Sequence, residues 1–279
     1  MNLEDEILYD IYRAFKVEFG KEYRDCRRIY PNTNEDLNAL FKNFTVKDKD
    51  VFSVLGSSDQ VLSSFYLGAK SVDSFDVNKL TIYYYYLRKW LITYLREEYI
   101  KEEYFKNGKY LIELIVGINP ISEDENKAKL FWLNYLARRE RIDKELFLHT
   151  HNNYKNVFDN DLENLSHKIK DLRFYNYDFS KKIVLNKKYD VIILSNILEC
   201  LENPKELLVA RDNIERLLKD DGICVCSHVM ETKENDFHKE EIKVMTSGNL
   251  IEYDFEDYYE DNITNGMHEV GYVYKKRQL

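Results

Sequence analysis

Short apolar runs that stop at a glycine or a polar residue constrain the fold of this chain more than any other feature. Residues 51–56 (VFSVLG) and 189–195 (YDVIILS) are rich in β-branched side chains and hardly alternate, which is typical of strands buried on both faces. Segments with apolar side chains at helical spacing lie between such runs. Strands that alternate with helices predict an α/β, doubly wound fold with a mostly parallel sheet.

Other elements follow from the same kind of pattern. The stretch 71–78 reads as a strand that ends in Asp76, and 171–179 as a strand that ends in Asp178-Phe179. Alternation in 271–276 (GYVYKK) suits a late edge strand. Helices are expected over 5–18, near 35–44, over 57–69, and from Pro204 to a turn at Gly222.

A chain of 279 residues suits one large domain or two small ones, and we expect a single domain over 1–279. Residues 1–45 would form an N-terminal helical arm. The helical pattern over 79–170 is too long for an ordinary crossover, so we expect an insertion that packs over the carboxyl edge of the sheet. Four tyrosines, 83–86, advance by about 100° each and should not all be in the core. We expect one or two to face the pocket, with Tyr84 as a candidate catalytic residue, or else all four to pack between helices with their hydroxyls at the surface.

Charge and hydropathy limit the partners that we expect. The net charge of −9, from 50 acidic and 41 basic residues, repels nucleic acid and anionic membrane surfaces. No helix combines a basic face with a strongly apolar one, and no run of about 18 apolar residues occurs. The first ten residues carry four carboxylates, unlike a secretory signal. We therefore expect a cytoplasmic protein with no nucleic-acid partner and no stable membrane association.

Cysteine and histidine spacing predicts no metal site. Cys224 and Cys226 fall two apart in an apparent strand and should point to one face as reduced thiols. Neither they nor the other cysteines have zinc-ligand spacing, and His149 and His151 have no third ligand nearby in the sequence.

Polar residues follow three successive predicted strands and together describe a site for adenosine. Gly56-Ser57-Ser58-Asp59 opens a helix whose first backbone N–H groups can face a polar ligand. Asp76 lies about twenty residues later, where an acid accepts hydrogen bonds from ribose hydroxyls. Asp178 can accept the adenine amino group while Phe179 covers the ring. Each feature alone could also have a purely structural role, such as a turn or a helix N-cap.

The glycine content of the first loop narrows the choice of cofactor. A dinucleotide site usually has G-x-G-x-x-G, but here Ser58 and Val61 replace the second and third glycines. A nicotinamide-dependent oxidoreductase is therefore disfavoured. S-adenosylmethionine, which has no phosphate, fits the loop better.

The sequence resembles a known class of enzymes over roughly 50–230. The motifs VFSVLGSSDQ, SFDVN, NYDF and YDVIILSNILECL resemble the successive motifs of class I S-adenosylmethionine-dependent transferases. Over about 30–100 and 189–201 the chain is similar to the BtaA-like family, which transfers the 3-amino-3-carboxypropyl group to diacylglycerol. The family's Asp-Leu-Asn-Pro stands here as Asp76-Val77-Asn78-Lys79, without the proline. No acceptor motif aligns, so the lipid substrate is not implied.

These observations give a set of candidate site residues. The cofactor-binding candidates are Gly56, Ser57, Ser58, Asp59, Asp76, Val77, Asn78, Asp178, Phe179 and Ser195. Asn196 and Glu199 follow the fourth strand, where they would orient the cofactor or deprotonate the acceptor, or else cap a helix and face solvent. Arg27 and Arg28 would clamp the cofactor carboxylate or form a solvated face, and the acidic stretch 253–262 would bind a basic acceptor or be solvated.

The function expected from the sequence is a transferase that uses S-adenosylmethionine. All three carbons on the sulfonium are electrophilic, and the one in line with the nucleophile reacts. The resemblance favours transfer of the aminocarboxypropyl group. The acidic net charge and the lack of a basic amphipathic helix favour a small soluble acceptor such as an amine, an amino acid or a peptide. Methyl transfer and a non-catalytic binding module on the same fold are the alternatives.

Overall fold

The computed structural model describes residues 2–15, 28–33, 35–147, 156–159, 161–201, 203–228, 236–254, 263–264, 267–268 and 270–277. These residues contain a seven-stranded sheet, whose strands lie in the order β3 (Arg173–Tyr175), β2 (Ser71–Phe75), β1 (Asp50–Val54), β4 (Tyr189–Ser195), β5 (Leu218–His228), β9 (Val270–Lys276) and β6 (Leu250–Asp254). The first five strands run parallel, and β9 is antiparallel to both of its neighbours. The short strands β7 (Ile263–Thr264) and β8 (Met267–His268) pair separately.

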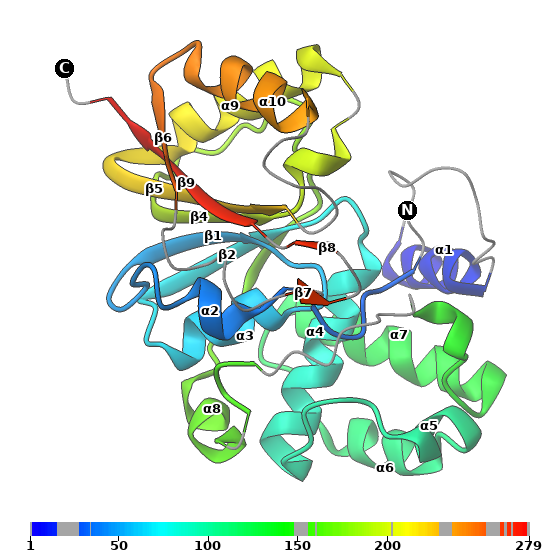
Figure 1. Cartoon of the computed structure of the whole chain (residues 1–279). Coiled ribbons are helices and arrows are strands. Elements are labelled where there is room, and N and C mark those ends of the chain that lie inside the picture. The colour runs from blue at the N-terminus through cyan, green and yellow to red at the C-terminus, as the bar shows by residue number, and fades with distance from the viewer. Residues whose placement is uncertain are drawn as a thin grey trace.

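Helices cover both faces of this sheet (Figure 1), which confirms the predicted doubly wound α/β fold. On one face, α3 (Asp59–Tyr66) packs against β1 and β2, beside α2 (Leu37–Leu40). On the other face lie α9 (Pro204–Leu217) and α10 (Asp236–Thr246). The order of the strands reverses at β1: β2 and β3 are added on one side of it, and β4 and β5 on the other. The carboxyl ends of β2, β1 and β4 therefore border one crevice.

The helices between β2 and β3 extend the layer on the α3 side, as the cyan and green ribbons of Figure 1 show. They are α4 (Leu80–Trp90), the π-helical turn η2 (Leu91–Leu95), α5 (Glu102–Lys106), α6 (Lys109–Gly117), α7 (Glu123–Arg139), the 3-10 turn η3 (Lys144–Leu146) and α8 (Leu162–Lys168). Helix α4 packs on α7, and α8 packs on α3 and η2. The helical segment thus adds a bundle to one face of the sheet, whereas we expected it over the carboxyl edge.

Helix α1 (Leu3–Phe15), the first part of the predicted N-terminal arm, docks on this bundle. It packs on α7, and its Asp10 carboxylate accepts the Tyr83 hydroxyl at 2.7 Å and lies 2.9 Å from the Lys79 ammonium. Asp10 is 3% exposed, so both partners compensate for its burial.

The four tyrosines of α4 are all buried, each at most 1% exposed, so the expectation that some would escape the core is wrong. Their hydroxyls reach partners in four different segments: Asp10, the Pro31 carbonyl, the Lys170 carbonyl and Ser122. Because the chain surrounds α4 on every side and supplies a polar partner for each hydroxyl, the whole circumference can be buried.

Three other features differ from the sequence prediction. Strand β3 ends at Tyr175, three residues before Asp178. Strand β9 lies inside the sheet, and β6, which the apolar pattern did not reveal, forms the edge next to α10. Helix α9 runs straight into β5 at Leu218, so Gly222 lies within a strand beside a register shift rather than in a turn.

The core under the pocket side of the sheet is aromatic. The Phe52 ring of β1 stacks between those of Phe75 and Tyr189, with centroids 4.7 and 4.8 Å apart. These rings fix the spacing of three neighbouring strands below the crevice. In the part of the chain that the structure describes, no helix has the length and apolar character needed to cross a membrane.

Candidate functional site

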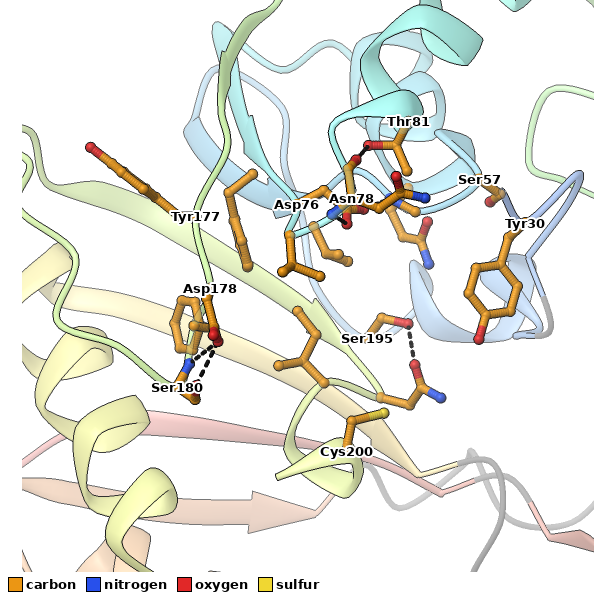
Figure 2. Close-up of a pocket in the computed structure, with 18 of the residues that line it drawn as sticks. Tyr30, Ser57, Asp76, Asn78, Thr81, Tyr177, Asp178, Ser180, Ser195 and Cys200 are labelled. Atoms are coloured by element: carbon orange, nitrogen blue, oxygen red, sulfur yellow. Dashed lines mark hydrogen bonds between the residues drawn. The ribbon is translucent and has the colours of Figure 1, made fainter. Parts of the chain in front are cut away.

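A pocket opens at the carboxyl ends of β1, β2 and β4 (Figure 2). Its wall contains Gly56 and Ser57 after β1, Asp76 after β2, Asp178 after β3, and Ser195 after β4. The three polar groups expected at successive strand ends therefore meet in one place. Other lining residues come from the segment before β1, namely Arg28, Tyr30 and Thr33, and from Gln60, Asn78, Thr81, Tyr177, Phe179, Ser180, Asn196, Ile197, Cys200 and Leu201.

The loop after β1 is tight and left-handed at two residues. Gly56 has φ +49° and Ser58 has φ 78°, and the Ser58 nitrogen donates to the Leu55 carbonyl at 2.6 Å. A side chain at Gly56 would meet no atom within 4 Å, so conformation rather than space favours glycine there. Ser58 is buried and is not among the lining residues, so only Gly56 and Ser57 of the predicted loop face the pocket.

Asp59 supports the site from behind and does not line it. It is 0% exposed, and its Oδ2 accepts the Thr33 nitrogen and the Ser57 hydroxyl, both at 2.6 Å. Its Oδ1 accepts Arg88 Nη1 at 2.7 Å, and Arg88 is also fully buried. The predicted cofactor contact of Asp59 is therefore replaced by an ion pair that joins the loop to α4.

Asp76 lies where the sequence placed it, at the end of β2 and facing the pocket. Its Oδ2 accepts the Gly56 nitrogen at 2.9 Å, and its Oδ1 accepts the Asn78 nitrogen at 2.8 Å. Burial raises the pKa of this carboxyl to about 6, although the Asn78 and Gly56 N–H groups oppose the shift. Each carboxylate oxygen can accept a further hydrogen bond, so Asp76 can still bind a diol.

Val77 and Asn78 also line the pocket. Val77 is 41% exposed, and Asn78 is buried with its Nδ2 donating to the Arg28 carbonyl at 2.9 Å. Asn78 thus ties the end of β2 to the segment before β1, and both segments contribute to the pocket wall.

Asp178 lines the same pocket as Asp76 (Figure 2). Its Oδ1 accepts the Ser180 nitrogen at 3.0 Å and the Ser180 hydroxyl at 2.6 Å, while its Oδ2 lies 3.3 Å from Lys181 Nζ. Burial raises the pKa of Asp178, but the Ser180 and Lys181 contacts outweigh it and hold the pKa below the usual value. This carboxylate stays ionised and can accept an amino group.

Aromatic side chains surround Asp178. Phe179 lines the pocket but is 3% exposed and packs on Phe75 with centroids 5.0 Å apart, so it belongs mainly to the core. Tyr177, which the sequence reading passed over, lines the pocket and stacks on Tyr175 at 5.4 Å. An aromatic ring is therefore available beside Asp178 to cover a flat heterocycle.

The predicted catalytic residues are separated by the structure. Asn196 lines the pocket next to Ser195, whereas Glu199, on the 3-10 turn η4 (Leu198–Cys200), and Tyr84 are not among the lining residues. Tyr84 lies in the helix layer, where its hydroxyl donates to the Pro31 carbonyl at 2.7 Å. None of the described residues between Thr81 and β3 lines the pocket, which corrects the expected role of the helical insertion.

Some candidates lie outside the described residues. Arg28 lines the pocket, but its neighbour Arg27 is not described, nor are His149, His151 and most of the acidic stretch 253–262. Cys224 and Cys226 are buried with their sulfur atoms 3.9 Å apart, so they share one face of β5 as predicted. Among the described side chains, no group of three His, Cys, Asp or Glu residues is placed to hold a metal ion.

Glu35 is the principal residue that the sequence reading missed. It is 0% exposed behind the pocket wall and accepts the hydroxyls of Ser195, at 2.6 Å, and Ser227. These partners lie 160 and 192 residues away along the chain, and no local pattern connects them with Glu35.

Comparison with known proteins supports no assignment by sequence. No protein-family model and no curated protein matches this chain. The strand order, with β9 antiparallel inside an otherwise parallel sheet, decides the fold. It is the class I methyltransferase-like Rossmann fold.

Solved structures with this fold are only distantly similar. The N-methyltransferase NodS from Bradyrhizobium japonicum, in complex with S-adenosyl-L-homocysteine, is 9% identical over 100% of both chains, with a TM-score of 0.44. A TehB-like methyltransferase from Corynebacterium glutamicum is 13% identical over 98% of both, with a TM-score of 0.43. The CcbJ methyltransferase from Streptomyces caelestis is 10% identical over 89% of this chain and 91% of its own, with a TM-score of 0.44. Similarity at this level does not assign a function to this chain, so any functional assignment has to rest on the residues of the pocket.

Proposed function

We propose that this protein is an S-adenosylmethionine-dependent transferase that moves the 3-amino-3-carboxypropyl group to a small soluble nucleophile. The observation that carries the proposal is the convergence of Gly56, Asp76 and Asp178 on one pocket. Asp76 offers carboxylate oxygens for a ribose diol, and Asp178 with Tyr177 offers an acceptor and a ring for adenine. The tight loop at Gly56 would then face the methionine part of the cofactor.

The protein would contribute mainly binding and alignment to the reaction. The sulfonium already makes its three attached carbons electrophilic, so a nucleophile held in line at about 3–3.5 Å needs little further chemistry from side chains. Ser195 and Asn196 follow β4 and line the pocket, and in this proposal they would orient the reacting end of the cofactor.

The choice of transferred group rests on the sequence motifs. Asp76-Val77-Asn78 after β2 and the loop with a single glycine after β1 resemble the BtaA-like enzymes, and this resemblance favours the aminocarboxypropyl group. Methyl transfer is the second candidate, because a small rotation of the same bound cofactor presents the methyl carbon instead. The acidic net charge of −9 favours a soluble acceptor over an anionic membrane surface.

The by-product separates the two reactions. Incubation with S-adenosylmethionine and a mixture of amines and amino acids should release 5′-methylthioadenosine, detected by mass spectrometry, if the aminocarboxypropyl group moves. Release of S-adenosylhomocysteine would instead establish methyl transfer. Asp76→Ala should abolish either product, whereas Asp50→Asn, at the amino end of β1, should not. Failure of the wild-type protein to bind S-adenosylhomocysteine by calorimetry near 1 mM would overturn the proposal.

A further inference from the structure

A buried polar cluster joins α3, α4 and the segment before α8 outside the pocket. It contains the Asp59–Arg88 ion pair, Glu98 after η2, and Asn156 and Asp159. Asp59 and Arg88 are 0% exposed, and Asn156 is 3% exposed. None of these five residues lines the pocket, and the proposed function gives no role to the last three.

Asn156 connects the cluster to the pocket wall. Its Nδ2 lies 2.9 Å from Asp59 Oδ1 and 2.7 Å from Glu98 Oε1. Asp59 in turn accepts hydrogen bonds from the Thr33 nitrogen and the Ser57 hydroxyl, and both of these residues line the pocket. A change at Glu98 can therefore reach the loop after β1 through one amide side chain and one carboxylate.

Two carboxyl groups of the cluster contact each other. The carboxyl group of Asp159 lies within hydrogen-bonding distance of that of Glu98. Two carboxylates repel each other at such a distance, so one of them has to carry a proton and donate it to the other. Glu98 and Asp159 thus form a carboxyl pair with one shared proton and a single negative charge.

The positive charge of Arg88 is paired with Asp59 and does not replace this proton. Arg88 Nη1 donates to Asp59 Oδ1 at 2.7 Å, and Arg88 Nε donates to the backbone carbonyl of Glu98, at 3.2 Å, rather than to its carboxylate. The other titratable groups around Glu98 are the hydroxyls of Tyr84 and Tyr99. Burial raises the pKa of both tyrosines, so they stay neutral.

The hydrogen bonds of the cluster are only partly satisfied. Asp159 Oδ1 and Asn156 Oδ1 are buried, and no described residue donates to either. The two hydrogens of Asn156 Nδ2 face three oxygens, those of Asp59, Glu98 and Tyr99. Each buried polar atom without a partner costs about 1–3 kcal/mol, so loss of the shared proton is enough to separate the members of this network.

The shared proton is lost near neutral pH. Burial raises the pKa of Glu98 to about 7, assisted by the Asp159 carboxyl and opposed by the Asn156 N–H and the charge of Arg88. The charge of the carboxyl pair therefore changes within the physiological range.

We propose that the Glu98–Asp159 pair is a pH-dependent contact that holds residues 156–159 against the loop after β1. With the shared proton in place, the pair keeps Asn156 beside Asp59. When the proton passes to solvent, the two carboxylates repel each other, residues 156–159 move away from Glu98, and Asp59 loses the Asn156 donor. The inference does not depend on the proposed function, because the contact needs no ligand.

Urea unfolding at pH 6 and pH 8.5 tests the shared proton. A folded-state pKa raised above the unfolded value of 4.5 means that Glu98 stabilises the fold fully below about pH 4.5, and that this contribution is lost as the pH rises through 7. Between pH 6 and pH 8.5 the unfolding equilibrium constant should therefore rise about tenfold more in wild type than in Glu98→Gln. The glutamine keeps a donor for Asp159 and an acceptor for Asn156 at every pH, so this variant retains the contact.

Hydrogen–deuterium exchange locates the effect in the chain. After correction for the intrinsic pH dependence of exchange, peptides covering 57–62 and 156–165 should exchange up to about tenfold faster at pH 8.5 than at pH 6 in wild type. Glu98→Gln should remove this response. Asp159→Asn should remove it as well, because its amide supplies the hydrogen from the other side. The control is Glu97→Gln, next in the chain, whose carboxylate pairs with Lys101 at 2.6 Å and which should respond as wild type does.

The inference is overturned if wild type and Glu98→Gln show the same dependence of the unfolding equilibrium constant on pH. It is also overturned if neither peptide of wild type responds to pH, or if Asp159→Asn responds as wild type does. A response of 156–165 without one of 57–62 would overturn it too, since the contact would then not reach the loop.

Discussion

The Oδ2 atom of Asp76 lies 2.9 Å from the backbone nitrogen of Gly56, twenty residues earlier in the chain. This hydrogen bond joins the ends of β2 and β1 at the centre of the pocket. The carboxylate expected to hold the ribose thus also fixes the loop that precedes α3, so cofactor binding and loop geometry depend on the same group.

Asp76→Asn should reduce the affinity for S-adenosylhomocysteine about 10- to 100-fold, because a hydrogen bond to a charged group is worth about 1.5–3 kcal/mol. Isothermal titration calorimetry measures the change. Asp50→Asn is the control, since Asp50 pairs with Lys219 at the other end of the same sheet. Equal affinities of Asp76→Asn and wild type would show that Asp76 does not contact the ligand.

The raised pKa of Asp76, about 6, makes cofactor binding depend on pH. Below pH 6 the carboxyl becomes protonated and loses acceptor capacity, so the Kd for S-adenosylhomocysteine should rise about tenfold per pH unit. The contribution of Asp76 to the free energy of unfolding should instead become more favourable as the pH falls. A folded-state pKa above the unfolded value means that this group stabilises the fold fully below about pH 4, and that this contribution is lost as the pH rises through 6. A flat Kd between pH 5 and 7.5 would contradict the assignment.

Breaking the buried pair of Arg88 and Asp59 should destabilise the protein strongly. Both side chains are 0% exposed, so Arg88→Met leaves an uncompensated carboxylate and should cost about 3–5 kcal/mol in the free energy of unfolding. Asp59→Leu combined with Arg88→Met should recover part of this loss. Lys106→Met, which removes an exposed pair with Glu102, should change stability by less than about 1 kcal/mol in urea denaturation. A small effect of Arg88→Met would show that water reaches Asp59.

Cys200 reports occupancy of the pocket. It lines the pocket and is exposed, whereas Cys224 and Cys226 are buried. Saturation with S-adenosylhomocysteine at about 100 Kd should slow alkylation of Cys200 by iodoacetamide more than about tenfold, as measured by peptide mass spectrometry. Labelling of Cys200 at the same rate with and without ligand would place the ligand elsewhere.

Elements whose hydrophobic pattern matches their burial in the fold could be predicted from the sequence. The run YDVIILS is β4 residue for residue, and the loop at Gly56 and the acid Asp76 lie where the motifs placed them. Buried parallel strands leave an unbroken apolar signature, and a turn that needs φ near +49° selects glycine. Both are local effects that one sequence can reveal.

Features set by distant contacts could not be found in this way. Phe179 carries an apolar ring that suits either an adenine cover or the core, and in the structure it both lines the pocket and packs on Phe75. Strand β9 alternates as an edge strand does, but it is covered by β6, whose position depends on the pairing of residues 250–254 with 272–276. Asp59 and Glu35 are acidic residues in polar stretches of the sequence. Only their buried partners show that they support the pocket wall and do not contact a ligand themselves.

The hydroxyl of Tyr84 holds the carbonyl of Pro31, and Pro31 lies between Tyr30 and Thr33, two residues of the pocket wall. A buried side chain of the helical layer therefore supports one wall of the pocket. A substitution such as Tyr84→Phe removes this support without changing any residue of the pocket wall, so residues inside the helical layer can affect the shape of the pocket.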